Sequence, residues 1–329
     1  MSLSALLTDL LTTPGWRRAP THADDAVPLV PGPENKELNV LIAAIGPIPG
    51  LMVQPCNSDD LRHRVIQTEL VDVDAFIRDG YVVVRGAFDV GIAAACRAVI
   101  WDSMSGQGVR EDDPATWPPL VEFDDLVGEP FTAAGTSPAL ASACNELIGP
   151  GRWTSPVNPG GAVVVRFPSE DRANAGYHIE GSYDGPAGYW VNVRSRGRGL
   201  LALFLFSDVG LDDAPTRLVC GSHLYVPEFL ASFGETGTNA DAVFWRPSVL
   251  CRPVAHATGR AGDVFLCHPF LIHTATWPHR GTVARMIAQP VVHAQEEFAI
   301  DGSDPSPIAR AIVAGLAMGR SIPPGTSVG

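Results

Sequence analysis

The chain has 329 residues, of which 46% are apolar and 18% charged, so it can bury a sizeable core. Its formal net charge of −13 argues against nucleic acid or an anionic membrane as a partner, because both would repel it. Counts of 33 glycines and 29 prolines favour many short strands joined by turns. The composition therefore argues against a helical bundle.

The six cysteines indicate neither a zinc site nor a disulfide framework, because no two of them have C-x-x-C spacing. The N-terminus lacks the basic start of a signal peptide, and the longest apolar run, residues 200–206, is far too short to span a bilayer. We expect a cytoplasmic protein that is a monomer or a homodimer.

The first part of the chain, residues 1–65, contains eight prolines that would interrupt any long element. Its apolar stretches, such as residues 41–45, are too hydrophobic to stay solvated. The sequence therefore predicts an irregular N-terminal extension that packs on the body of the protein.

The body, residues 66–329, is expected to begin with helices. Asp72 can cap a short helix that ends at Gly80, and Asp89 opens an amphipathic helix. A further helix is expected at the C-terminal end, over residues 306–318.

A strand pattern begins near residue 160 and continues to about residue 293. The six expected strands cover residues 162–167, 189–193, 200–206, 217–220, 263–267 and 284–292. The run over residues 200–206 is apolar throughout, which is typical of a strand buried on both faces. The predicted fold is mainly β, a sandwich or barrel flanked by α-helices.

His178-Ile179-Glu180, followed after a long gap by His273, is the pattern that carries chemistry. Residues two apart point to the same face of a strand. Two imidazoles and one carboxylate can bind Fe(II) on one octahedral face and leave the opposite face open for a co-substrate and O2. Because H-x-E triplets are common by chance, this spacing alone is weak evidence.

Further motifs surround these three residues. They are residues 76–86, 206–209, 215–223, 262–273 and 285–290. Together with the triad, in this order and spacing, they resemble the phytanoyl-CoA dioxygenase-like family of Fe(II)/2-oxoglutarate oxygenases over roughly residues 70–293. The resemblance implies a double-stranded β-helix, or cupin-like jelly roll, with N-terminal helices, and this agrees with the strand pattern.

The resemblance implies that His178, Glu180 and His273 bind the iron and form the catalytic centre. The family usually has aspartate where this chain has Glu180, which is one methylene longer and can still bind iron. A carboxylate at this position favours oxygenation over halogenation, because related halogenases lack it.

The resemblance also assigns Arg285, twelve residues after the distal histidine, to the far carboxylate of 2-oxoglutarate. The planar guanidinium can pair two hydrogen bonds with a carboxylate. Arg280 is a nearby competitor, but its surroundings indicate a loop. Where the family often has a small hydroxyl residue this chain has Ala275, so Thr274 and Thr276 beside it are the expected additional co-substrate contacts.

Two other histidines are expected to have roles other than metal binding. His268 lies five residues before His273, so both cannot face one metal from a regular strand. We expect His268 to support the site or the fold, and His223 to be structural.

The implied reaction oxidises a C–H bond of a small organic molecule, a secondary-metabolite intermediate for example, and converts 2-oxoglutarate and O2 to succinate and CO2. Hydroxylation is the first expectation, with desaturation or ring formation as alternatives. Residues that flank the ligands or share a strand face are the expected substrate contacts: Tyr177, Tyr183, Trp190, Asn192, Arg194 and Trp277.

Two other functions stay open at this point. The chain could be a cupin-like metalloenzyme that does not use 2-oxoglutarate, or a non-catalytic jelly-roll binding protein. Glu180 and Ala275, where this chain departs from the usual family pattern, are compatible with both functions.

Overall fold

The computed structural model describes residues 17–18, 29–30, 71–154, 157–170, 176–186, 188–240 and 247–320. Strands β1 (Arg17–Arg18) and β2 (Leu29–Val30) and helix α8 (Pro247–Leu250) belong to one compact unit. All other elements belong to a second unit, called the body here. The predicted packing of residues 1–65 on the body lies outside the described residues.

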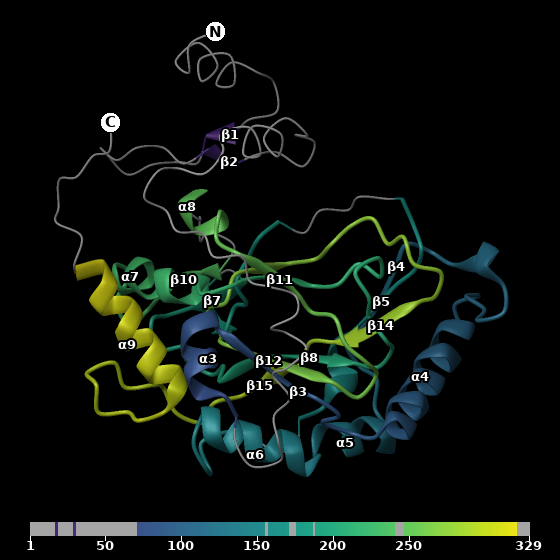
Figure 1. The fold of residues 1–329 in the computed structure, drawn as a ribbon, viewed down its shortest axis with the longest axis horizontal. Helices are drawn as coiled ribbons and strands as arrows, with labels where there is room; N and C mark the ends of the chain where they lie inside the picture. The colour runs from purple at the N-terminus through teal and green to yellow at the C-terminus, as the bar shows by residue number, and fades with distance from the viewer. Residues whose placement is uncertain are drawn as a thin grey trace, which may run out of the picture. The chain divides into compact units, whose positions relative to one another are not determined.

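The centre of the body is a seven-stranded antiparallel sheet (Figure 1). Its strands, in spatial order, are β3 (Tyr81–Val84), β12 (Val264–Cys267), β8 (Leu200–Leu205), β14 (Arg285–Ala288), β5 (Val163–Arg166) and β4 (Leu120–Phe123), with β15 (Val291–Val292) also paired to β8. The predicted strand over 284–292 is divided into β14 and β15 around Pro290, which has no N–H to donate to a sheet.

Two smaller antiparallel sheets complete the β-structure of the described body. One contains β11 (Val254–His256), β9 (Arg217–Val219) and β13 (His273–Thr274), and the other contains β10 (Thr238–Asn239), β7 (Tyr189–Val191) and β6 (Tyr183–Asp184). The first of them packs on the large sheet, since Leu218 and Ala255 share one buried cluster with Leu203 and Ile287. Two antiparallel sheets around one apolar interior confirm the predicted jelly-roll architecture.

Strand β8 is buried on both faces, as its continuous apolar run predicts. Leu203 and Leu205 face the interior cluster between the sheets. On the opposite face the ring centroid of Phe204 lies 5.8 Å from that of Phe88, and Phe206, just beyond the strand, lies 5.7 Å from Phe131. One strand therefore joins the β interior to the helical layer.

The helices flank the sheets, and the three that the sequence predicts, after Asp72, after Asp89 and near residue 306, begin where expected. They are α3 (Val73–Asp79), α4 (Val90–Ser105), α5 (Glu129–Gly135), α6 (Pro138–Leu147), α7 (Val226–Ala231) and α9 (Pro307–Arg320), with 3-10 turns at Pro114–Thr116, Pro159–Ala162 and Ser222–Tyr225. Asp72 accepts a hydrogen bond from the backbone N–H of Ala75, and Gly80 ends α3 with a φ of 89°. Asp89 caps α4 in the same way through Gly91. Over the described part of the chain, none of the helices has the length and hydropathy needed to cross a bilayer.

The interior cluster generates a stability prediction. Replacing the fully buried Leu203 with alanine should lower the free energy of unfolding by about 2–5 kcal/mol, because it removes apolar contacts and leaves a cavity. Urea denaturation followed by circular dichroism measures this change. Leu211→Ala is the control, since Leu211 is 69% exposed and its loss should cost little. Equal stabilities of the two variants would contradict the position of the core.

Candidate metal centre

Backbone pairing brings two of the predicted ligands together. His273 lies on β13, and His178 lies opposite it in an isolated antiparallel bridge. Each backbone N–H donates to the other residue's carbonyl oxygen at 3.0 Å. The two imidazole rings consequently lie side by side, with centroids 4.4 Å apart.

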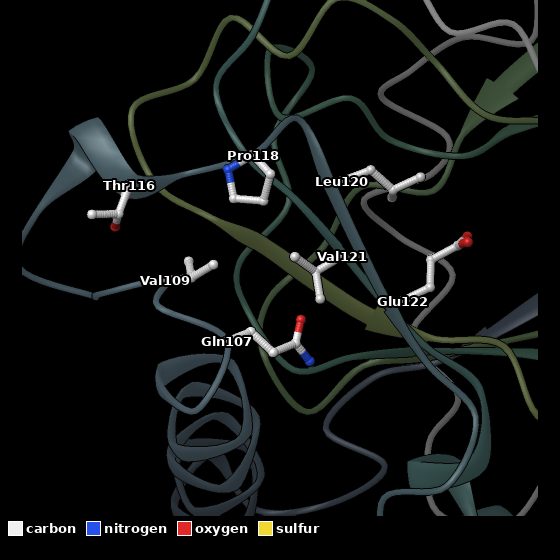
Figure 2. A pocket seen from close by; sticks show the side chains of 7 residues that line it. All are labelled: Gln107, Val109, Thr116, Pro118, Leu120, Val121 and Glu122. Atoms are coloured by element: carbon white, nitrogen blue, oxygen red, sulfur yellow. The ribbon is translucent and has the colours of Figure 1, made fainter.

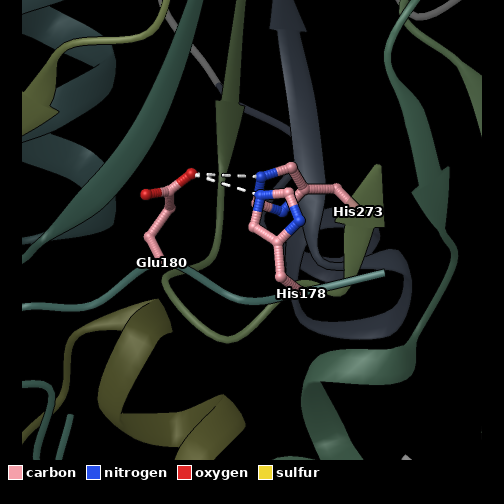
Figure 3. A group of neighbouring side chains, drawn as sticks. All are labelled: His178, Glu180 and His273. Carbon is pink, nitrogen blue, oxygen red and sulfur yellow. Dashed lines mark hydrogen bonds and ion pairs between the residues drawn. The ribbon is translucent and has the colours of Figure 1, made fainter. Parts of the chain in front are cut away.

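Glu180 completes the predicted triad (Figure 3). Its Oε1 lies 3.3 Å from Nε2 of His273 and 3.8 Å from Nε2 of His178, and the three ligand atoms lie within 4.8 Å of one another. For bonds of about 2.1 Å, ligands at neighbouring corners of an octahedron are about 3 Å apart, so a small contraction would seat a metal ion. This is the one group of three or more potential metal ligands within the described ranges.

The other nitrogen of each imidazole fixes the ring for metal binding. Nδ1 of His178 lies 2.9 Å from the carbonyl oxygen of Gly176, and Nδ1 of His273 lies 2.9 Å from that of Leu271. A carbonyl oxygen can only accept, so each Nδ1 carries a proton and each Nε2 is left to face Glu180. The two Nε2 atoms and the carboxylate converge on one point, where a proton or a metal ion can lie between them.

Arg198 lies beside the outer carboxylate oxygen of Glu180. Its Nη2 lies 3.7 Å from Oε2 of Glu180, and its Nε donates to the carbonyl oxygen of Gly181 at 3.0 Å. Burial acts to raise the pKa of Glu180, but the contacts with the two histidines and the charge of Arg198 hold it well below the usual value. The carboxylate is therefore ionised at neutral pH, with Oε1 directed at the histidines.

Arg285 and a second arginine project into the same interior. Arg285 on β14 is 2% exposed, and Arg166 on β5, its register partner directly opposite, is 7% exposed. They share strand faces with Ile287 and Val164, which pack in the cluster between the two sheets. Because His273 belongs to the small sheet that packs on this cluster, the arginines and the metal ligands enter the interior from opposite sheets.

The two guanidinium groups keep unused hydrogen-bond donors. Nη1 of Arg285 donates to the carbonyl oxygen of Ala214, but its Nε and the Nε and Nη1 of Arg166 have no partner among the described residues. Burial, reinforced by the charge of Arg166, lowers the pKa of Arg285 to about 9, and burial lowers that of Arg166 to about 10. Both remain cationic at neutral pH, so an anion entering this interior would find charged donors.

The residues that follow His273 extend from the metal ligands toward these arginines. Thr274 is buried and its hydroxyl donates to the carbonyl oxygen of Ala275 at 3.4 Å. The hydroxyl of Thr276 is buried without a partner among the described residues. The ring of Trp277 lies under the guanidinium of Arg166, with 4.1 Å from Cζ to the ring centroid.

The other predicted substrate contacts are distributed differently. Tyr183 and Trp190 line a hollow of about 270 Å3, whose remaining lining residues are Asp184, Gly185, Pro186, Arg196, Glu235 and Thr236. Tyr177 lies against the guanidinium of Arg217. Asn192 and Arg194 are held by protein partners, because the Asn192 amide donates to the Glu235 carbonyl oxygen and Nε of Arg194 pairs with the Glu235 carboxylate.

A second hollow of about 520 Å3 lies beside β4 (Figure 2). It is lined by Gln107, Val109, Thr116, Pro118, Leu120, Val121 and Glu122. Glu122 is the one ionisable side chain in this lining, so the hollow has no grouping for acid–base chemistry or metal binding.

His268 and His223 are fully buried and lie outside the triad, where the sequence analysis expects them. Their ring centroids are 4.9 Å apart. Nδ1 of His268 accepts from the backbone N–H of Phe270 at 3.1 Å, so its Nε2 carries the proton toward the carbonyl oxygen of Ile308. These contacts join the β-structure to α9.

Two residues of the site are missing from the sequence predictions, Arg166 and Arg198. Arg198 continues an alternating series with Arg194 and Arg196 that is typical of a solvated strand face. Arg166 ends the apolar run of β5, and a charged residue at the end of a buried strand is the one local signal for it.

No protein-family model matches this sequence, and no curated protein matches it either. Among solved structures, the chain is similar to the epimerase SnoN in complex with Fe3+, alpha-ketoglutarate and nogalamycin RO, at 19% identity and a TM-score of 0.49 over 83% of this chain and 93% of that one. The alpha-ketoglutarate-dependent carbocyclase SnoK from nogalamycin biosynthesis is similar at 18% identity and a TM-score of 0.46, over 73% and 90%.

HygX from Streptomyces hygroscopicus, with nickel and 2-oxoglutarate bound, is similar at 17% identity and a TM-score of 0.43, over 70% of this chain and 90% of that one. With TM-scores below 0.5, these neighbours assign no activity to this chain. Its chemistry therefore has to follow from its own site.

The contact between Arg198 and Glu180 predicts an effect on metal affinity. Arg198→Met should weaken Fe(II) binding about 10- to 100-fold, because the carboxylate loses the group that orients it. Anaerobic isothermal titration calorimetry measures the dissociation constant. Arg196→Met is the matched control, because Arg196 pairs with Glu297 and contacts no metal ligand. An Arg198 variant with unchanged Fe(II) affinity would rule out the positioning role.

Proposed function

We propose that the protein is an Fe(II)- and 2-oxoglutarate-dependent oxygenase that hydroxylates a C–H bond of a small organic molecule. The observation that carries the proposal is the convergence of two imidazole Nε2 atoms and one carboxylate oxygen on a single point in a jelly-roll body. This donor set fits a non-haem Fe(II) site with one open octahedral face.

His178, Glu180 and His273 would hold the iron, and Arg285 would bind the far carboxylate of 2-oxoglutarate. Iron, 2-oxoglutarate and O2 supply the oxidation, with 2-oxoglutarate converted to succinate and CO2. The buried Arg285 offers Nε, a donor without a partner among the described residues, to that carboxylate. Thr276 supplies a further unused hydroxyl on the segment that leaves the metal ligand.

The chain's own residues prepare the site before any ligand enters. The carbonyl oxygens of Gly176 and Leu271 hold each Nδ1, so both rings keep the orientation that presents Nε2. Arg285 is 2% and Arg166 7% exposed, so both guanidinium groups are largely removed from water, which strengthens their attraction for an anion.

The finer part of the proposal concerns family and substrate. The order of motifs from residue 70 to residue 293 supports membership of the phytanoyl-CoA dioxygenase-like family. The hollow beside Tyr183 and Trp190 supports a substrate of moderate size with an apolar surface and polar groups, such as a secondary-metabolite intermediate. The indole N–H of Trp190 is buried without a partner within the described part of the chain, and it could donate to such a substrate.

Stepwise anaerobic addition of Fe(II) and then 2-oxoglutarate to the metal-free protein tests the proposed function. A weak visible charge-transfer band should appear after the second addition. A band-free protein that still binds Fe(II) would support a cupin-like metalloenzyme that does not use 2-oxoglutarate. Failure to bind Fe(II) would support a non-catalytic binding protein.

Arg285→Met should weaken 2-oxoglutarate binding about 10- to 100-fold, since it removes a charged hydrogen-bond donor to the carboxylate. Fe(II) affinity should stay unchanged, because Arg285 has no contact with the triad among its described contacts. The absorbance titration gives both constants on one sample. If the variant binds 2-oxoglutarate as tightly as the unmodified protein, the role of Arg285 is wrong.

A further inference from the structure

We propose that Arg166 and Arg285 bind the far carboxylate of 2-oxoglutarate together, and that Arg166 makes the site selective for a 2-oxo acid with a second carboxylate. This inference rests on the proposed function, and it gives Arg166 a role that the sequence pattern does not predict. Three features of the described structure support it.

The first feature is the placement of two like charges. Arg166 and Arg285 are direct partners in the β5–β14 register, so their side chains leave the sheet on the same face with Cβ atoms about 4.5–5.5 Å apart. The charge of Arg166 lowers the pKa of Arg285, so the two buried cations repel each other. Neither forms an ion pair within the described residues, although the charge of Asp213 acts on Arg285 and that of Glu122 acts on Arg166. An anion between them would remove the repulsion.

The second feature is the geometry of the Arg166 guanidinium. Trp277 covers one of its faces at 4.1 Å, which fixes the plane of the group. The donors Nε and Nη1 lie in that plane and have no partner among the described residues. Nε and Nη1 belong to different edges of the guanidinium, because the side-on fork pairs Nε with Nη2, as Arg78 does with Asp79. A fixed plane with two unused charged donors can still donate to a carboxylate from either edge.

The third feature is a set of further donors on the segment that carries Trp277. Nδ1 of His279 accepts from the backbone N–H of Gly281 at 3.1 Å, so Nε2 carries the ring proton, and this buried Nε2 has no partner among the described residues. The charge of Arg285 acts on His279, which places the two groups near each other. The charge of Asp213 also acts on both Arg285 and His279, so one carboxylate lies near this side of the arginines. Nε of Arg285 and Nε2 of His279 still have no partner among the described residues and remain for a second anion.

The deciding experiment measures 2-oxoglutarate binding to the Fe(II)-loaded, oxygen-free protein by absorbance titration and calorimetry. Arg166→Met should raise the dissociation constant for 2-oxoglutarate at least about tenfold and leave Fe(II) affinity unchanged. Arg110→Met is the matched control, because it removes the same charge from a side chain that is 64% exposed.

Selectivity gives a second readout. 2-Oxopentanoate has the same chain length as 2-oxoglutarate but no far carboxylate. The unmodified protein should prefer 2-oxoglutarate strongly, and Arg166→Met should reduce this preference at least about tenfold. The double variant Arg166→Met/Arg285→Met should lose less affinity than the sum of the two single losses, because both arginines act on one carboxylate.

The outcomes separate the two proposals. If the unmodified Fe(II) protein shows no 2-oxoglutarate-dependent band, the proposed function fails. If that band appears and Arg166→Met binds 2-oxoglutarate with the same affinity and preference, only the role of Arg166 is wrong. Should Arg166→Met fail to fold, Arg166→Lys decides, since it keeps the charge but loses the planar guanidinium and its Nε and Nη1 donors. A dissociation constant for the lysine variant equal to that of the unmodified protein would overturn the inference.

Discussion

The site depends on one short backbone pairing, the two hydrogen bonds between His178 and His273. His178 and His273, which are distant in sequence, become direct neighbours there, and the centroids of their imidazole rings lie 4.4 Å apart. Each imidazole is then oriented by a carbonyl oxygen two residues before it, from Gly176 or Leu271. The positions of the two Nε2 atoms thus follow from local backbone geometry, which is rigid on the side of β13 because that strand pairs with β9.

The electrostatics of the interior follow from this arrangement. Glu180 and Arg198 form one close pair of opposite charges, whereas Arg166 and Arg285 add two positive charges on the facing sheet. A divalent metal on the triad would increase the positive excess. Desolvation makes such an excess costly, so a dianion that reaches both the metal and the arginines would stabilise the loaded site more than a monoanion of the same size.

Features that depend on neighbouring residues could be predicted from the sequence. Features that depend on the pairing of distant strands could not. The caps at Asp72 and Asp89 and the doubly buried strand β8 follow from neighbouring residues, and the structure confirms them. The triad could be predicted because the order and spacing of the motifs around it resemble those of a known family. Arg166 could not, because its importance arises from the β5–β14 register, and a register between strands more than a hundred residues apart is not written in either strand.

Ala275 and Arg166 are best understood together. In the family that the sequence resembles, a hydroxyl residue often stands two positions after the distal histidine and helps to hold 2-oxoglutarate. Ala275 has no such donor, so a carboxylate next to Arg285 would lack one hydrogen bond. The guanidinium of Arg166 lies opposite Arg285 with two unused donors among the described residues, and the same segment places Trp277 against it. A charged donor is stronger than a neutral hydroxyl, so under the proposed role Arg166 would take the place of that hydroxyl.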